Sequence, residues 1–213
     1  LRRELRNGEK IALPPVFLIF TEEYYNSAML TDLKNIRFDF GGESCYPLIN
    51  KYDNLLVVMT FSKSRSMAGA RLGFAIGSKE LIEDLNKIKY STNPYNVNRM
   101  TLAAGVATIN ENDYYMNNCK KIMEVREYVT EELIKQGFEV IPSKANFIFA
   151  KNNKFEGEFI YSELKKRGVL VRHFDNDKIK PYNRITIGAK EQMDKLLKIT
   201  KIITEMGDSN ENK

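Results

Sequence analysis

Two short apolar runs, LLVVMTF at residues 55–61 and RLGFAIG at residues 71–77, place the strongest constraint on how this chain folds. Each run is too short for an ordinary helix, and the first is rich in β-branched residues. Continuous apolar runs of this kind are typical of strands that are buried on both faces of an α/β sheet. We therefore expect two strands here, joined by a loop of small, hydroxyl and basic residues.

Helix and strand signals alternate after the second run. A helix is expected to begin after a cap at Ser78, and a long helix is expected over residues 113–136, ended by Gly137. Between them, MTLAAGVATIN predicts a small-residue helix. Further strands are predicted in FEVIPSKANFIFAK, VLVRHF and RITIG, and further helices in EFIYSELKKRG and KEQMDKLLKITKIITEM.

A break in this pattern near residues 110–113 predicts a domain boundary. We expect part of a larger α/β domain at 38–111 and a small α/β domain at 112–206. The polar tail at 207–213 is predicted to be disordered. Residues 1–37 stay unassigned, although the run IALPPVFLIF within them is expected to pack in the core.

Charge and hydropathy exclude some function classes. The net charge is +5, but lysines are interleaved with glutamates along the predicted helices, which indicates solvated faces and not a nucleic-acid surface. No apolar run approaches the roughly 20 residues that cross a bilayer. The chain has two widely spaced cysteines, Cys45 and Cys119, and one histidine, His173. This excludes a disulfide scaffold, makes a metal site unexpected, and fits a cytoplasmic protein.

The loop between the two apolar runs concentrates groups that bind phosphate. Thr60 and Ser62 supply hydroxyls at the end of the first run, and Arg71 follows between Gly69 and Gly73. Loops at the carboxyl ends of buried strands are where α/β sheets bind ligands. Two hydroxyls and a guanidinium that converge there would form a phosphate cup.

Lys63 stands directly beside these groups. A lysine amine whose pKa is lowered by its surroundings can form a Schiff base with an aldehyde. Phosphate, aldehyde and lysine together describe pyridoxal 5'-phosphate (PLP). On spacing alone, a solvated strand–loop–strand with scattered basic residues explains the same segment equally well.

The segment TFSKSRSMAGARLGFAIGS (residues 60–78) resembles the Schiff-base lysine segment of fold-type I PLP-dependent aminotransferases. It is most similar to the histidinol-phosphate aminotransferases, whose pattern T-x-S-K, small-residue loop, G-x-R-x-G is complete here. The resemblance extends over roughly residues 38–206 and implies the C-terminal part of a fold-type I large domain followed by a small α/β domain. It also implies that Lys63 binds the PLP aldehyde and that Thr60, Ser62 and Arg71 hold its phosphate.

The resemblance continues downstream. RITIG looks like the family segment whose arginine, here Arg184, grips the substrate carboxylate, and GVLVRHF suggests that Arg172 assists at the anionic end of the substrate. In SKANFIFA, which looks like the family's S-x-x-N-F segment, Asn146 could reach the active site. A surface role for Arg172 and a structural role for Asn146 are equally open, and His173 is expected at the surface.

Some family segments do not occur before the lysine. Residues 1–58 contain no N-P-x-x-P-T-G segment, and where the family usually reads D-E-A-Y this chain has Lys34 and Arg37 at the positions of the aspartate and tyrosine. The aspartate keeps the pyridine nitrogen of PLP protonated, and a lysine would oppose that protonation. A truncated or rearranged gene product, a divergent member with a shortened large domain, and a first section that is not native all fit.

The sequence supports two hypotheses about function. The first is a transaminase that moves an amino group between an amino acid or histidinol phosphate and a 2-oxo acid, with Lys63 as the Schiff-base and proton-transfer residue. The second is a vestigial aminotransferase-like protein that binds a ligand or partner without catalysis. The family resemblance further implies a homodimer, and neither nucleic acid nor a membrane is expected as a partner.

Overall fold

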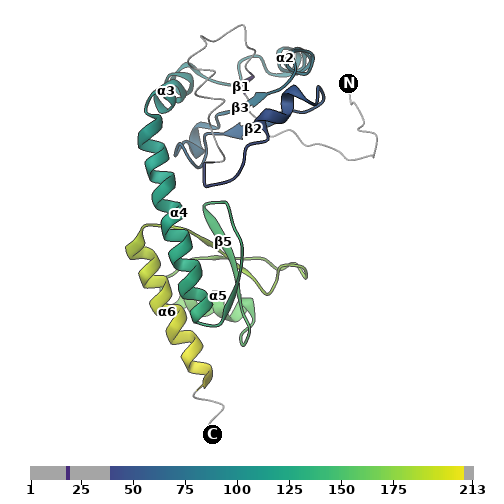
Figure 1. Ribbon diagram of the computed structural model, residues 1–213. Helices are drawn as coiled ribbons and strands as arrows, with labels where there is room; N and C mark the ends of the chain where they lie inside the picture. The colour runs from purple at the N-terminus through teal and green to yellow at the C-terminus, as the bar shows by residue number, and fades with distance from the viewer. Residues whose placement is uncertain (1–17, 20–38, 209–213) are drawn as a thin grey trace. The chain divides into compact units, whose positions relative to one another are not determined.

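The computed structural model describes residues 18–19 and 39–208 (Figure 1). Contacts within the chain divide it into two compact units. The first unit contains the described residues 18–19 and 44–112, and the second contains residues 39–43 and 113–208. Each unit has a sheet and a hydrophobic cluster of its own.

The described sheet of the first unit has three strands in the order β1-β3-β2. Strand β1 (Leu18–Ile19) runs parallel to β3 (Gly73–Ile76), while β2 (Val57–Thr60) runs antiparallel to it. Strands β2 and β3 therefore form where the two apolar runs predict them. The register pairs the last residue of β2 with the first residue of β3, so the sheet closes the base of the loop between them.

Burial differs between these two strands. Strand β3 is buried over most of its length, but β2 alternates half-buried and exposed residues, and 41% of Val58 is exposed. The expectation of burial on both faces is therefore wrong for β2. In the described part of the chain β2 lies at the edge of the sheet, and its alternating pattern shows that only one of its faces is packed.

Side-chain caps begin the two α-helices that the structure describes in the first unit. The Ser78 hydroxyl accepts a hydrogen bond from the amide of Leu81 at 3.4 Å, which confirms the predicted cap. The Asn98 side chain accepts from the amide of Thr101 at 2.8 Å. The helices of this unit are η2 (Tyr46–Asn50), η3 (Ala68–Ala70), α2 (Lys79–Thr92) and α3 (Arg99–Asn110).

The core of the first unit lies directly beneath the loop that joins β2 to β3. Phe61 and Leu72, the two ends of that loop, are buried with Phe74 and Ile109, and the rings of Phe61 and Phe74 meet edge to face at 5.9 Å. Helix α3 approaches closely because Gly105 has no side chain: a Cβ atom there would lie 2.4 Å from Leu72 Cδ2. The loop is thus anchored at both ends on packed residues.

The described sheet of the second unit is antiparallel throughout, with strand order β4-β5-β7-β6. Strand β5 alternates half-buried and buried residues, so one face of the sheet packs and the other is partly open. The strands are β4 (Phe138–Ile141), β5 (Phe147–Asn152), β6 (Arg172–His173) and β7 (Asn183–Thr186). The helices are α4 (Asn112–Lys135), α5 (Gly157–Lys166) and α6 (Lys190–Asp208).

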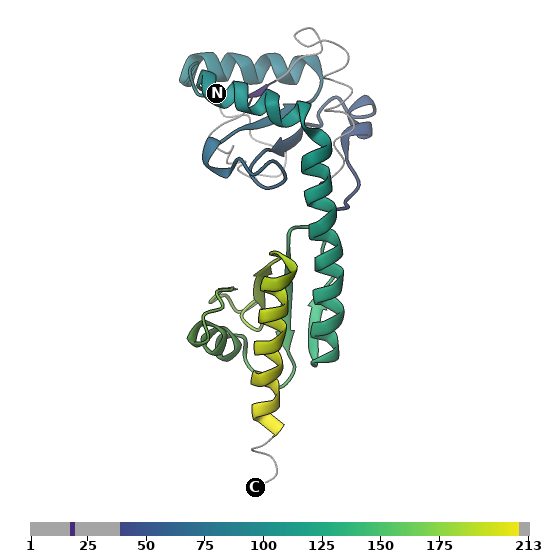
Figure 2. The same cartoon turned by 90° about the vertical axis from the view of Figure 1, so that its left-hand side faces the viewer.

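Helices α4, α5 and α6 share one hydrophobic core with the packed face of this sheet. Ile148 and Ala150 of β5 are buried with Leu133 of α4, Leu164 of α5 and Leu196 of α6. Helices α4 and α6 lie side by side in both views (Figures 1 and 2), where the Tyr128 hydroxyl donates to Asp194 Oδ1 at 2.9 Å. The predicted end of α4 is confirmed, because Gly137 adopts a φ of 80° just beyond it.

The segment at residues 39–43 lies with the second unit, whereas the sequence pattern groups it with residues 44–111. The buried Arg126 of α4 donates to the carbonyl of Phe40 at 3.0 Å, which fixes this segment against α4. At the other end of the unit, α6 continues through Asp208, so residues 207 and 208 are helical and not part of a tail. Residues 209–213 lie outside the described residues, as do Lys34 and Arg37.

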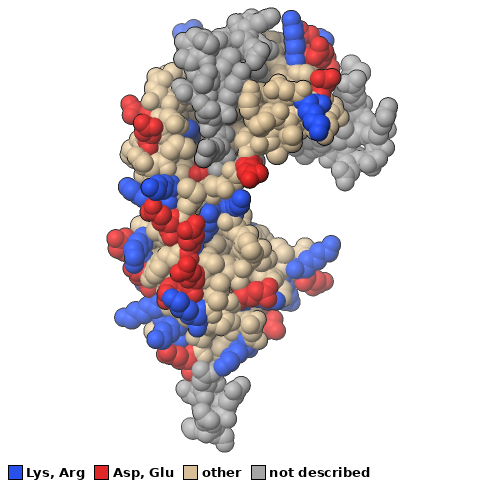
Figure 3. Space-filling model, in the orientation of Figure 1, with Lys and Arg blue, Asp and Glu red and all other residues tan. Residues whose placement is uncertain are grey.

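Acidic and basic side chains are interspersed over the second unit on the face shown in Figure 3. Several form pairs within one helix, such as Lys166 with Glu163 at 2.7 Å on α5. No helix in the described ranges combines the length and the apolar character needed to cross a bilayer.

Candidate active site

The candidate cofactor site lies in the loop between β2 and β3. Thr60 pairs with Gly73 in the sheet, and the Phe61 amide then donates to the Leu72 carbonyl at 3.0 Å. The next residues on the two sides of the loop are Ser62 and Arg71, so the antiparallel register brings them to opposite sides of its mouth. The structure therefore brings together the three residues that the sequence assigns to phosphate binding, Thr60, Ser62 and Arg71.

Lys63 begins a tight turn in this loop. The Ser66 amide donates to the Lys63 carbonyl at 3.2 Å, and Ser66 adopts a left-handed φ of 56°. The two central residues of the turn, Ser64 and Arg65, are 7% and 3% exposed, whereas Lys63 is exposed. The turn therefore directs its middle into the protein and leaves the lysine side chain accessible.

The polar groups around Lys63 are largely uncommitted. The side chains of Thr60, Ser62 and Lys63 make no hydrogen bond or ion pair with any residue that the structure describes. Arg71 is exposed, adopts a φ of 56°, and uses Nη1 to donate to the Ala68 carbonyl at 3.2 Å. Two hydroxyls, an amine and the remaining guanidinium donors fit an anionic ligand that carries both a phosphate and an electrophilic carbon.

Arg65 is a buried residue of the lysine turn that the sequence prediction did not single out. Its guanidinium donates to the Thr108 carbonyl at 3.1 Å and to Asn112 Oδ1 at 2.8 Å. These contacts fix the lysine turn to the last turn of α3 and to the first residue of α4. The only available signal was a second arginine in a loop of otherwise small residues, and that signal does not distinguish a buried arginine from an exposed one.

The predicted substrate residues lie in the second unit. Arg172 of β6 and Arg184 of β7 are direct cross-strand partners, so their side chains extend from the same face of the sheet. The Phe174 ring lies beside both guanidinium groups, with Cζ distances to the ring centre of 5.3 Å for Arg172 and 5.9 Å for Arg184. Phe147 lies 5.3 Å from Arg184 Cζ in the same way.

The electrostatics of this arginine pair favour an anion. Like charges placed directly opposite each other destabilise a sheet unless something neutralises them. The Nε atom of Arg184 is buried and has no hydrogen-bond partner among the described residues. A carboxylate or phosphate would relieve the repulsion and satisfy the guanidinium donors, which is what a binding site for an anionic substrate requires.

Asn146 is the third predicted substrate residue and immediately precedes β5. Its carbonyl accepts from the Ile187 amide at 3.0 Å, while its side-chain amide makes no hydrogen bond with a described residue. Arg126, which the sequence prediction also missed, donates to the neighbouring Ala145 carbonyl at 2.8 Å. The backbone at Asn146 is therefore fixed, and its side chain is available to a ligand.

The remaining chemically notable residues do not join these groups. His173 is partly buried, and its ring stacks on Tyr161 at 5.9 Å, so it is less exposed than the sequence suggests. The Nδ1 atom of His173 is buried and has no hydrogen-bond partner among the described residues. Neither cysteine forms a disulfide; Cys45 is exposed and Cys119 is buried.

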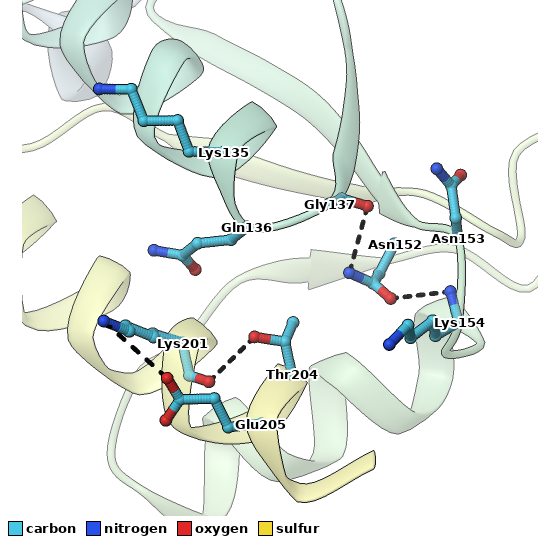
Figure 4. A pocket seen from close by; sticks show the side chains of 9 residues that line it. All are labelled: Lys135, Gln136, Gly137, Asn152, Asn153, Lys154, Lys201, Thr204 and Glu205. Carbon is cyan, nitrogen blue, oxygen red and sulfur yellow. Dashed lines mark hydrogen bonds and ion pairs between the residues drawn. The ribbon is translucent and has the colours of Figure 1, made fainter. Parts of the chain in front are cut away.

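A polar pocket of about 460 Å³ lies elsewhere on the second unit, near the end of α4 (Figure 4). Several of its polar groups are paired with one another: Lys201 contacts Glu205 at 3.9 Å, and Asn152 Nδ2 donates to the Gly137 carbonyl at 3.4 Å. None of the predicted site residues lines it. The lining residues are Lys135, Gln136, Gly137, Asn152, Asn153, Lys154, Lys201, Thr204 and Glu205.

Shifted pKa values in the second unit arise from ion pairs at its surface. The Lys190 ammonium, followed by the Tyr128 hydroxyl, lowers the pKa of the Asp194 carboxyl. On the open face of the sheet, Lys151 and then Tyr182 lower the pKa of Glu139. These groups are ionised at neutral pH and contribute to stability, not to proton transfer.

The fold is shared with solved structures. The histidinol-phosphate aminotransferase from Clostridium acetobutylicum covers 89% of this chain and 63% of its own length, with a TM-score of 0.71 and 23% identity. The histidinol-phosphate aminotransferase from Sinorhizobium meliloti, solved in complex with PLP, covers 72% of this chain and 42% of its own, with a TM-score of 0.63 and 23% identity. Over the part that it covers, the chain therefore has the fold of these proteins, the fold type I class.

The sequence then defines the family. The model of the family "Aminotransferase class I and II" matches residues 16–199, and the chain belongs to this family. The histidinol-phosphate aminotransferase of Clostridium beijerinckii is 49% identical over 165 residues, which is 78% of this chain and 46% of that protein. The chain spans about half the length of the curated relatives it matches. The predicted fold class and family are therefore confirmed.

Proposed function

We propose that this chain binds PLP and acts as a transaminase, moving an amino group between an amino acid or histidinol phosphate and a 2-oxo acid. The observation that carries the proposal is the loop between β2 and β3. It presents an accessible lysine amine beside two hydroxyls and a guanidinium, and the amine and hydroxyls have no partner among the described residues. Such a set at the mouth of one hairpin fits a ligand that carries both a phosphate and an aldehyde.

The residues of the loop fit PLP in separate roles. The Thr60 and Ser62 hydroxyls and the Arg71 guanidinium would hold the phosphate through charge-assisted hydrogen bonds. The Nζ atom of Lys63 would bond to the aldehyde carbon with loss of water, and would later carry a proton to and from the α-carbon of the substrate. Bound PLP supplies an electron-withdrawing ring that stabilises the negative charge left on that carbon.

The substrate would be anionic at one end. Arg184 would grip its carboxylate or phosphate, Arg172 would assist from the neighbouring strand, and the Asn146 amide would supply a further hydrogen bond. The cross-strand arginine pair and the buried Nε of Arg184 support this assignment. The relative from Clostridium beijerinckii, named a histidinol-phosphate aminotransferase, supports histidinol phosphate as the donor to test first.

We further infer that the chain is cytoplasmic and self-associates as a homodimer, in line with the fold-type I resemblance of its lysine segment. Sedimentation that gives a single species at the 24.6 kDa mass of one chain would count against self-association.

A second function is favoured by one specific observation. Lys34 stands where the family usually has the aspartate that keeps the pyridine nitrogen protonated, and a lysine opposes that protonation by charge repulsion. The chain would then bind PLP, or a partner protein, without catalysing transamination.

Transamination measured directly on this chain separates the two functions. The wild-type chain is supplied with PLP, a 2-oxo acid, and either histidinol phosphate or L-glutamate, and the amino product is quantified by mass spectrometry. The proposal predicts product with the wild type and none with Lys63→Ala. Covalent PLP binding without product from any donor would favour the second function, while equal product from both proteins would contradict the role of Lys63.

A further inference from the structure

The buried side chain of Arg65 has no role in the function proposed above, although it belongs to the same turn as Lys63. Arg65 is 3% exposed, and burial of a charged side chain is costly unless its donors are satisfied. Two of its guanidinium contacts, to the Thr108 carbonyl and to Asn112 Oδ1, reach residues more than forty positions away in the sequence. These contacts hold the turn against helices α3 and α4, whereas the turn's own hydrogen bonds join only neighbouring residues.

The two acceptors are well suited to a cation. Thr108 lies in the last turn of α3, where carbonyl groups lack helical partners and the helix dipole is negative. Asn112 is the first residue of α4, so its side chain is fixed to a second helix. A planar guanidinium can donate to both at once, whereas a lysine ammonium at the same position has no such fork.

Backbone hydrogen bonds of the turn connect the position of Arg65 to that of Lys63. The turn is closed by a hydrogen bond from the Ser66 amide to the Lys63 carbonyl at 3.2 Å. The Met67 amide also donates to the Phe61 carbonyl at 3.1 Å. Because the Lys63 side chain has no partner among the described residues, only its backbone determines where its amine can reach. Arg65 is two residues further along the same closed turn, so fixing Arg65 fixes the position from which the lysine side chain departs.

We propose that Arg65 is a positioning residue that holds Lys63 where its amine meets the aldehyde of PLP. The inference rests on the proposed function. It assigns to Arg65 an effect on covalent capture by Lys63 and not on the phosphate contacts of Thr60, Ser62 and Arg71. Misplacing a reacting group by about 1 Å costs on the order of a hundredfold in rate, so loss of the Arg65 contacts should slow capture by tenfold or more.

The test compares two probes on the full chain. PLP reports covalent capture, followed by its visible absorbance and by borohydride fixation to Lys63. The analogue 4'-deoxypyridoxine 5'-phosphate has no aldehyde and reports only non-covalent binding. The variants are Arg65→Met, which keeps the length of the side chain, and Asn112→Ala, which removes one acceptor and leaves the buried guanidinium in place. Asn112→Asp restores an acceptor, and Arg99→Met, an exposed arginine at the start of α3, is the charge-matched control.

The proposal predicts that Arg65→Met and Asn112→Ala capture PLP about tenfold or more slowly, while their affinity for the analogue changes by less than about threefold. Asn112→Asp should recover the wild-type rate, and Arg99→Met should match the wild type. Equal losses with both probes, or unchanged capture by Asn112→Ala, would overturn the positioning role. If the wild type itself captures no PLP, the proposed function fails, and this inference fails with it.

Discussion

Arg172 and Arg184 face each other directly across the antiparallel pair β6–β7, and the Phe174 ring lies within 5.9 Å of both guanidinium groups. Two opposed effects act on this pair when no ligand is bound. Like charges on opposite strands repel, while each guanidinium gains a cation–π contact, and each effect amounts to about 0.5 kcal/mol at a partly exposed site. The pair is therefore close to neutral for folding and favourable for an anion.

Replacing Arg172 by Gln should separate binding from stability. The free energy of unfolding without ligand should stay within about 0.5 kcal/mol of the wild type, because repulsion and cation–π attraction are lost together. Affinity for an anionic substrate should fall about tenfold, the usual effect of removing a charge-assisted hydrogen bond. Thermal unfolding with and without histidinol phosphate measures both quantities. The exposed Lys198→Gln of α6 is the charge-matched control, and an equal loss of affinity in that variant would contradict a specific role for Arg172.

Arg71 and Lys63 should differ in how they affect PLP. Arg71→Ala removes a charge-assisted anchor and should cost about 1.5–3 kcal/mol of PLP binding. Lys63→Ala should leave the phosphate contacts intact, so PLP still binds but without covalent attachment. Equilibrium dialysis gives the affinity, and borohydride treatment gives the covalent fraction. Unchanged PLP affinity in Arg71→Ala would show that the loop does not hold the phosphate.

Gly105→Ala should destabilise the first unit beneath the candidate site. The added methyl group would lie 2.4 Å from Leu72 Cδ2, and Leu72 is 2% exposed, so neither side can move freely. Overpacking of this kind costs about 1–3 kcal/mol, which exceeds the gain in helix propensity from glycine to alanine. Chemical denaturation measures the difference. Gly69→Ala, where a Cβ would contact nothing within 4 Å, is the control and should unfold like the wild type. A stabilised Gly105→Ala variant would refute the close contact.

Asp194 should make the second unit sensitive to acid. Lys190 and then Tyr128 lower the pKa of its carboxyl in the folded state, so its contribution to stability is complete above about pH 4, the pKa of an unfolded aspartate, and is lost as the pH falls through the lower folded value. Asp194→Asn should therefore lose stability at pH 7 and show a flatter dependence of Tm on pH between about pH 2 and 5. Glu191→Gln, an exposed neighbour on α6, should keep the wild-type slope. The same slope in Asp194→Asn would rule out this linkage.

Local patterns in the sequence predicted most of the described elements. The apolar runs predict β2 and β3, Ser78 predicts the start of α2, and Gly137 predicts the end of α4. Strand formation, capping and the left-handed glycine each depend on a few neighbouring residues. The burial of β2 could not be predicted in this way, because it depends on which strands lie beside it.

The same distinction between local and distant contacts decides which site residues the sequence could predict. Lys63 and Arg71 stand in a continuous motif and could be recognised from the sequence. Arg65 and Arg126 could not, because each is buried beside acceptors that are distant in the sequence, among them Thr108 and Asn112 for Arg65 and Phe40 and Ala145 for Arg126. Nothing in the composition of a loop or helix tells a buried arginine from a solvated one.

Titration of PLP into the wild-type chain beside Lys63→Ala, followed by borohydride reduction and peptide mapping, tests most directly whether the loop between β2 and β3 is a PLP site. We predict a visible absorbance band that saturates at one PLP per chain in the wild type, with the reduced PLP on the peptide that contains Lys63. The Lys63→Ala variant should show no such band and no labelled peptide. Equal, weak binding by both proteins, with label spread over surface lysines, would contradict the assignment.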